Sequence, residues 1–139
     1  MPMTTPAIPE GFQPLFRSSP FLDTTGPFYG KGQGAALVIG LRVLEKHCNT
    51  RGTIHGGLLA TLADVALGYA TAYSQGNPVG LTTASLTLDY AGTAKLGDWV
   101  EARVDIQKLG KRLAFANAYI WAGDMRIVRA SASFTVDAD

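Results

Sequence analysis

One long stretch of the sequence is almost without charge, and it constrains the fold more than any other feature. Between Gly52 and Leu88 the only acidic or basic side chains, tyrosine aside, are His55 and Asp64. Through residues 58–73, leucine, valine, alanine and tyrosine recur at steps of three and four, and small residues fill the other faces. This spacing predicts a helix that is apolar nearly all round and therefore buried. Glycines at its start and the Ser-Gln-Gly-Asn-Pro run at 74–78 set its limits.

The remaining sequence predicts strands. Apolar and polar residues alternate over 100–107 and 128–136, whereas 113–121 is apolar on both faces apart from Asn117, as in a central strand. Residues 35–44 and 81–90 are two further predicted strands. The fold class is therefore α+β, with one long helix wrapped by a curved antiparallel sheet of five to six strands, the last four forming a meander. We expect residues 1–30 to form an N-terminal segment, irregular or with one short helix, and 31–139 a single domain.

The composition excludes several classes of protein. A chain of 139 residues with a formal net charge of +1 is one domain without the basic excess that nucleic-acid binding needs. The sequence contains no run of about 18 apolar residues, so we expect no membrane span. A single cysteine, Cys48, excludes an internal disulfide and fits a cytoplasmic protein. Charged residues make up 17%, below the roughly 25% usual in soluble domains, so we expect a second copy to cover part of the surface as a homodimer.

Asp64 is the candidate catalytic residue. A carboxylate on an apolar helix loses hydration unless something specific uses it, so Asp64 suits a general base or a nucleophile. The alternative is a structural carboxylate that binds a nearby backbone amide or hydroxyl.

Residues 53–57 (TIHGG), at the start of the same helix, are the second candidate element. Free N–H groups at a helix N-terminus bind oxyanions, and glycine permits close approach, although a plain glycine-rich helix start is the commoner interpretation. Gly56 and Asp64 are eight residues apart, about 12 Å along one helix, too far to serve one carbonyl. Two antiparallel helices across a dimer interface would bring Gly56 of one protomer to Asp64 of the other.

Three other motifs carry little weight. The GKGQGA run at 30–35 is similar to a dinucleotide fingerprint, but a strand rather than a helix follows it. His47 and Cys48 are adjacent, and neighbours on a strand point to opposite faces, so they are not expected to form a nucleophile and base. With two histidines and one cysteine, a metal site is not expected.

Three segments together resemble the hotdog-fold acyl-CoA thioesterases, in the branch of phenylacetate-pathway and 4-hydroxybenzoyl-CoA thioesterases. They are NTRGTIHGGLLATLAD at 49–64, YAGTAKLGD at 90–98 and LGKRLAF at 109–115, and the resemblance spans roughly residues 35–136. It implies a homodimer, often a dimer of dimers, that hydrolyses an acyl-CoA thioester to a carboxylate and free CoA. It implies no metal and no cofactor beyond the CoA of the substrate.

The resemblance also implies roles for individual residues. Gly56 would donate its N–H to the thioester oxygen with Asn49 nearby, while Asp64 attacks the carbonyl or activates a water that Thr83 orients. A slip of one residue in this comparison would assign Thr82 instead. The CoA arm would be lined from 90–95 and 108–113, with these residues as candidates: Tyr90, Lys95, Lys108, Gly110, Lys111 and Arg112.

Other functions remain open from the sequence. A non-catalytic acyl-CoA-binding protein would need the same pocket without an acid on the helix, and Asp64 argues against it. A hotdog hydratase or dehydratase would pair an acid with a histidine, and His55 is the candidate. An oligomeric scaffold with a structural Asp64 is the third alternative.

Overall fold

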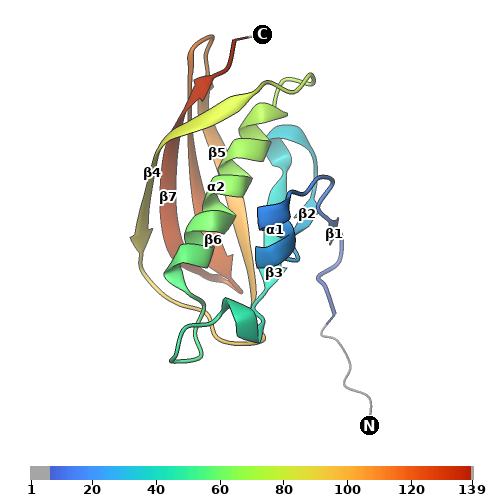
Figure 1. Ribbon diagram of the computed structural model, residues 1–139, viewed down its shortest axis with the longest axis vertical. Coiled ribbons are helices and arrows are strands. Elements are labelled where there is room, and N and C mark those ends of the chain that lie inside the picture. Colours follow the sequence, from blue (N-terminus) through green and yellow to red (C-terminus); the bar gives the residue numbers. More distant parts are fainter. Residues whose placement is uncertain (1–6, 139) are drawn as a thin grey trace.

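A long helix, α2 (Gly56–Ala72), lies against one face of a single antiparallel sheet in the computed structural model (Figure 1). The structure describes residues 7–138, so the first six residues of the predicted N-terminal segment, and Asp139, lie outside the described part. The predicted architecture of one helix on one antiparallel sheet is confirmed. The other elements are β1 (Gln13–Pro14), α1 (Pro20–Thr25), β2 (Tyr29–Lys31), the 3-10 turns Gly34–Ala36 and Glu45–His47, β3 (Val38–Arg42), β4 (Leu81–Tyr90), β5 (Trp99–Leu109), β6 (Leu113–Ala122) and β7 (Met125–Val136).

The sheet has seven strands in the order β1-β2-β3-β5-β6-β7-β4. It exceeds the predicted five to six because the short strands β1 and β2, from the N-terminal segment, add to the free edge of β3. The predicted four-strand meander is wrong for β4, which pairs with β7 rather than β5. Both edges of β5 are already occupied by β3 and β6, so the connection 91–98 crosses the end of the sheet, and the N–H groups of Ala91 and Gly92 donate to the carbonyl of Ile127.

Alanines on the sheet let α2 pack closely against it. The inner positions of the central strands are small, which leaves room for the leucines of the helix. On α2 the buried face holds Leu58, Leu59, Leu62, Ala63, Ala66, Leu67, Ala70 and Thr71. Opposite them, the buried sheet positions include Val100, Ala102, Ala114, Ala116, Ala118, Ile120, Val128, Ala130 and Phe134. Each leucine buried in this way contributes about 1.5–3 kcal/mol.

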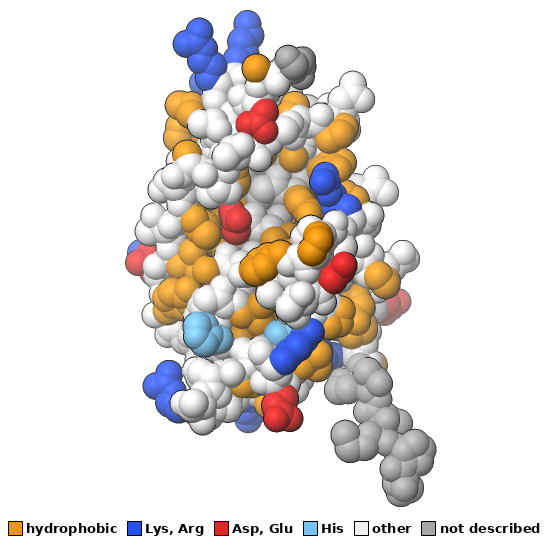
Figure 2. Space-filling view, viewed as in Figure 1, with side chains coloured by type: hydrophobic (Ala, Val, Ile, Leu, Met, Phe, Trp, Pro, Cys, Tyr) orange, Lys and Arg blue, Asp and Glu red, His pale blue; other side chains and the backbone are white. Residues whose placement is uncertain are grey.

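The opposite side of α2 is uncovered in the single chain. Gly57 is exposed, and Ala60, Thr61, Asp64 and Gly68 are half-buried. The neighbouring strand β4 is exposed or half-buried along its whole length and pairs on one edge only. Figure 2, drawn from this side, shows hydrophobic side chains over the face with few charged ones between them. A helix face and a sheet edge of this kind can both accept a second chain.

The outer face of β6 is also exposed. Its inward residues are buried as expected of a central strand, but Leu113, Phe115 and Tyr119 are 46%, 40% and 38% exposed. The prediction of a strand apolar on both faces is right, yet in one chain only the inner face is covered.

The N-terminal segment packs beside α2. Its helix α1 is capped by Ser19, and Phe16 stacks edge-on against Tyr73. The Arg17 guanidinium donates to the Tyr73 hydroxyl, and this hydrogen bond raises the pKa of Arg17. Among residues 7–138, no helix is both long and apolar enough to cross a membrane.

Candidate active site

Asp64 is held in place from strand β4. It lies on the uncovered face of α2, and the Thr83 hydroxyl donates to its Oδ1 at 2.8 Å. The hydroxyl of Thr82 instead donates to Oδ1 of Asp137 at 2.9 Å, because adjacent strand residues point to opposite sides. The contact therefore pairs Thr83, and not Thr82, with Asp64. One carboxylate oxygen is engaged, which leaves Oδ2 for a water or a substrate.

The first turn of α2 presents one free backbone donor. The N–H of Gly57 donates to Nδ1 of His55 at 2.9 Å, and those of Leu58 and Leu59 donate to the His55 carbonyl. Within residues 7–138 the N–H of Gly56 makes no hydrogen bond. A helix normally leaves its first N–H groups without partners, and here capping has satisfied all of the early ones except that of Gly56.

His55 acts as the helix cap. Because its Nδ1 accepts from Gly57, the neutral imidazole carries its proton on Nε2. The residue is exposed at the mouth of the helix. The capping bond occupies one of the two ring nitrogens that a proton-transfer role would use.

Asn49 closes the loop that leads into α2. Its Oδ1 accepts from the N–H of Arg51 at 2.9 Å and of Thr53 at 3.3 Å, and its Nδ2 donates to the Thr53 hydroxyl at 2.9 Å. The Asn49 side-chain amide has two N–H groups, and the bond to Thr53 uses one of them. Asn49 can therefore order the loop and still offer the second N–H as a donor beside the helix start.

Tyr90 contacts the same turn from the end of β4. Its hydroxyl donates to the carbonyl of Gly56 at 2.7 Å, although the side chain is 52% exposed. Strand β4 thus contacts α2 at Asp64 through Thr83 and at Gly56 through Tyr90. Sequence reasoning placed Tyr90 only near the CoA arm, and nothing in its pattern indicated this contact.

The candidate CoA-binding cations lie at two ends of the molecule. Lys95 is near the start of α2, where its residue pairs with Thr53. Lys108 lies at the end of β5, and Gly110, Lys111 and Arg112 form the β5–β6 turn that follows, at the far end of β5 from Lys95 (Figure 1). One chain therefore does not bring these two groups together.

His47 and Cys48 do not contact each other through their side chains. The ring of His47 is buried, accepts from the N–H of Leu44 at Nδ1 and donates from Nε2 to the carbonyl of Thr25 at 2.7 Å. His47 ends a 3-10 turn rather than lying on a strand as we expected. Cys48 Sγ lies 3.4 Å from the carbonyl of Leu44. In the described part of the chain, no three His, Cys, Asp or Glu side chains cluster as metal ligands do.

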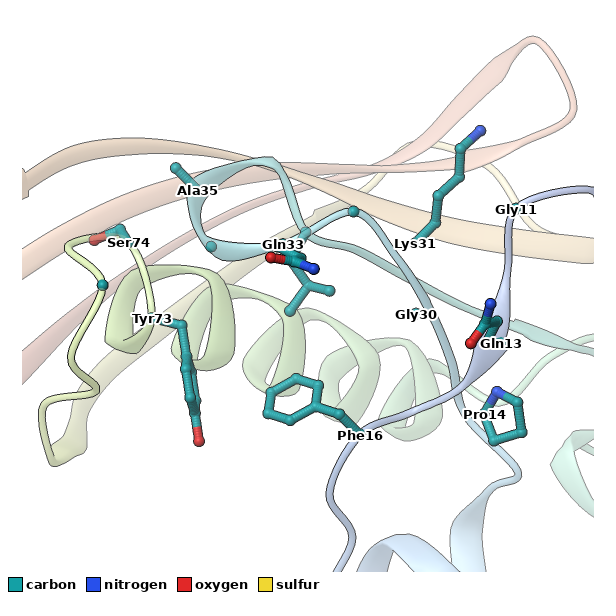
Figure 3. A pocket seen from close by; sticks show the side chains of 14 residues that line it. Gly11, Gln13, Pro14, Phe16, Gly30, Lys31, Gln33, Ala35, Tyr73 and Ser74 are labelled. Carbon is teal, nitrogen blue, oxygen red and sulfur yellow. The ribbon is translucent and has the colours of Figure 1, made fainter.

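The glycine-rich run at 30–35 lines a groove of about 760 Å³, in which Phe16 and Tyr73 form one wall (Figure 3). Strand β3 follows this run, as predicted, after the single 3-10 turn Gly34–Ala36, and no α-helix of residues 7–138 begins there to bind a pyrophosphate. Tyr73 comes nine residues after Asp64, or two and a half helical turns, so the groove lies on the other side of α2 from the carboxylate.

The fold and the site define a class of protein, the hotdog thioester hydrolases, and comparison with known proteins gives the family. Residues 51–129 match the model of the family described as the thioesterase superfamily. This chain belongs to that family, and the predicted thioester hydrolase activity and hotdog fold are confirmed.

Three similar proteins illustrate the relationship. The Pseudomonas aeruginosa protein named "Putative esterase PA0474" is 52% identical over 128 residues, which cover 91% of this chain and 96% of that protein. Mouse acyl-coenzyme A thioesterase 13 is 36% identical over 81 residues, 58% of this chain and 57% of that protein. A variant of the phenylacetic acid degradation protein PaaI from Thermus thermophilus has the same fold, with a TM-score of 0.75 at 24% identity over 84% of this chain and 98% of that one.

Proposed function

We propose that this protein hydrolyses acyl-CoA thioesters, with the Gly56 N–H polarising the carbonyl and Asp64 acting as nucleophile or general base. The observation that carries the proposal is the Gly56 amide, which has no hydrogen-bond partner within residues 7–138 at the start of a long helix. The acyl-CoA thioesterase relative supports CoA as the leaving group.

The chemistry follows from these groups. The thioester oxygen accepts from Gly56 N–H, and the positive end of the helix dipole stabilises the negative charge that develops on this oxygen. Asp64 attacks the carbonyl carbon and forms a mixed anhydride that water then hydrolyses, or it takes a proton from a water that attacks the carbon directly. The C–S bond breaks, and CoA leaves as a thiolate that takes up a proton. Thr83 holds the carboxylate by its hydrogen bond to Oδ1, and Oδ2 is the oxygen that takes part in the reaction.

A homodimer would assemble the site. About 12 Å separates Gly56 from Asp64 along α2, so each site takes Gly56 and Asn49 from one protomer and Asp64 and Thr83 from the other. The uncovered face of α2 and the unpaired edge of β4 support this association. The exposed Leu113 and Phe115 on the outer face of the sheet support further pairing of dimers into a tetramer.

The same arrangement would complete the CoA arm. A two-fold axis across α2 places the β5–β6 turn of one protomer, with Lys108, Lys111 and Arg112, at the end that carries Lys95 of the other. The phosphates of CoA would then meet cations from both chains. Since these side chains are exposed, each contributes little alone, and affinity rests on several together.

Release of free thiol from a panel of aryl, short-chain and long-chain acyl-CoAs tests the proposal. We expect wild type to turn over at least one class, and Asp64→Asn and Asp64→Ala to lower kcat by about 10²–10⁴-fold. Asp105→Asn is the matched control, because Asp105 is an exposed carboxylate on β5, a strand that supplies none of the proposed catalytic residues, and it should retain full activity. Equal rates in wild type and both Asp64 variants would overturn the mechanism, and saturable binding without turnover would instead indicate an acyl-CoA-binding protein.

A further inference from the structure

Tyr90 is placed against the backbone of the proposed oxyanion donor. Its hydroxyl donates to the Gly56 carbonyl at 2.7 Å, and a methyl group built on Gly56 would lie 3.5 Å from the Tyr90 ring. The ring therefore lies directly beside the Gly56 Cα, although half of its surface is exposed. This contact is within one chain and does not need a second protomer.

We propose that Tyr90 is a positioning residue that fixes the direction of the Gly56 N–H, and that this is its main role rather than contact with CoA. The inference rests on the proposed function of Gly56 as the donor to the thioester oxygen. It assigns to the end of β4 a part in catalysis that acts through the backbone of α2.

The first turn of α2 needs such support because of its composition. Gly56 and Gly57 are consecutive, and glycine loses more conformational freedom on folding than any other residue. First helical turns also fray, since their N–H groups have no partners within the helix. The His55 ring accepts from the Gly57 N–H and the Tyr90 hydroxyl donates to the Gly56 carbonyl, so both bonds hold the peptide group that joins Gly56 to Gly57. The Gly56 N–H belongs to the preceding peptide group, whose His55 carbonyl accepts from the N–H groups of Leu58 and Leu59.

The precision that catalysis requires makes this restraint matter. A donor stabilises an oxyanion only when it lies about 2.7–3.1 Å from the oxygen, and a shift of about 1 Å can cost 10²-fold in rate. The hydrogen bonds hold the peptide groups on both sides of the Gly56 Cα, and they leave the Gly56 N–H little freedom to change direction. Tyr90 therefore acts on the rate of the chemical step, whereas a CoA contact would act on binding.

Tyr90→Phe in the 139-residue chain tests the inference, because it keeps the ring against Gly56 and removes only the hydroxyl. We expect kcat to fall about tenfold, as for the loss of one hydrogen bond, while KM for acyl-CoA stays within about twofold of wild type. The NMR order parameter of the Gly56 N–H should fall from about 0.85 toward 0.6. Tyr119→Phe, on the outer face of the sheet, is the matched control and should change neither quantity.

Two results would overturn the inference. A rise in KM with kcat unchanged would assign the hydroxyl to CoA binding, and an unchanged Gly56 order parameter would show that Tyr90 does not order the turn. Both results are distinct from failure of the proposed function, which is read from Asp64→Asn in the same assay. The relaxation measurement needs no turnover, so it tests the role of Tyr90 whichever substrate the protein uses.

Discussion

A single methyl group added at Gly56 tests the first turn of α2 without removing any hydrogen bond. In Gly56→Ala the new Cβ would lie 3.5 Å from Cε1 and Cζ of Tyr90 and 3.6 Å from its hydroxyl, which are ordinary van der Waals contacts. Alanine is favoured over glycine within a helix by up to about 1 kcal/mol. We therefore expect the free energy of unfolding to be unchanged or raised by at most about 1 kcal/mol, with Tm unchanged or up by about 4 °C at most.

The kcat of Gly56→Ala for thioester hydrolysis should fall, although its stability is kept. The methyl group occupies space beside the N–H through which a thioester carbonyl must approach, so the donor is lost to the substrate. Loss of one oxyanion donor costs about 10²–10³-fold in kcat. Thiol release and thermal denaturation are to be measured on the same preparation, so that the loss of rate is read from a protein shown to be folded.

Gly68→Ala is the control for helix propensity. Its Cβ would meet only Cε1 of Phe134, at 3.8 Å, so it should gain a similar amount of stability, and it adds no atom near the first turn. Full activity in Gly56→Ala would refute the approach of the carbonyl to this amide. A loss of more than about 1 kcal/mol in its free energy of unfolding would refute the steric reasoning.

Two further substitutions test contacts described above. Thr83→Val removes the hydrogen bond to Asp64 and should lower kcat about tenfold at nearly unchanged Tm. Thr82→Val loses only a hydrogen bond to Asp137 and should keep the wild-type kcat. Equal rates in the two variants would contradict the role of Thr83. His47→Ala removes a buried ring and leaves the half-buried N–H of Leu44 and carbonyl of Thr25 without this partner, so urea denaturation should show a loss of about 2–3 kcal/mol in the free energy of unfolding. A loss under about 1 kcal/mol would mean that water replaces the ring.

The helix and the long strands were predictable because their periodicity survives in the sequence. Steps of three and four residues over 58–73 and alternation over 100–107 and 128–136 correspond to α2, β5 and β7. The place of β4 beside β7 was not predictable from the sequence. The alternation within a strand shows which of its faces is buried, but it does not show which other strand pairs with its edge. The strands β1 and β2, of two and three residues, are too short to show any period.

The candidate site was predictable in its residue types but not in its contacts. An acid on an apolar helix and glycines at the helix start pointed to Asp64 and Gly56 from chemistry alone. The choice between Thr82 and Thr83 needed the register of β4, which the sequence leaves open by one residue. The bond from Tyr90 to Gly56 joins residues far apart in the chain and has no local signal at all.

The only N–H in the first turn of α2 without a partner among the described residues belongs to the main chain, which limits how mutagenesis can reach it. No side-chain truncation deletes this donor, and alanine scanning would pass over it or block it without removing it. The two side chains that hold this turn, His55 and Tyr90, can by contrast be substituted directly. A series of substitutions at these two positions would therefore change the direction of the Gly56 N–H in small steps. The reaction rate could be varied in this way while Gly56 and Asp64 stay unchanged.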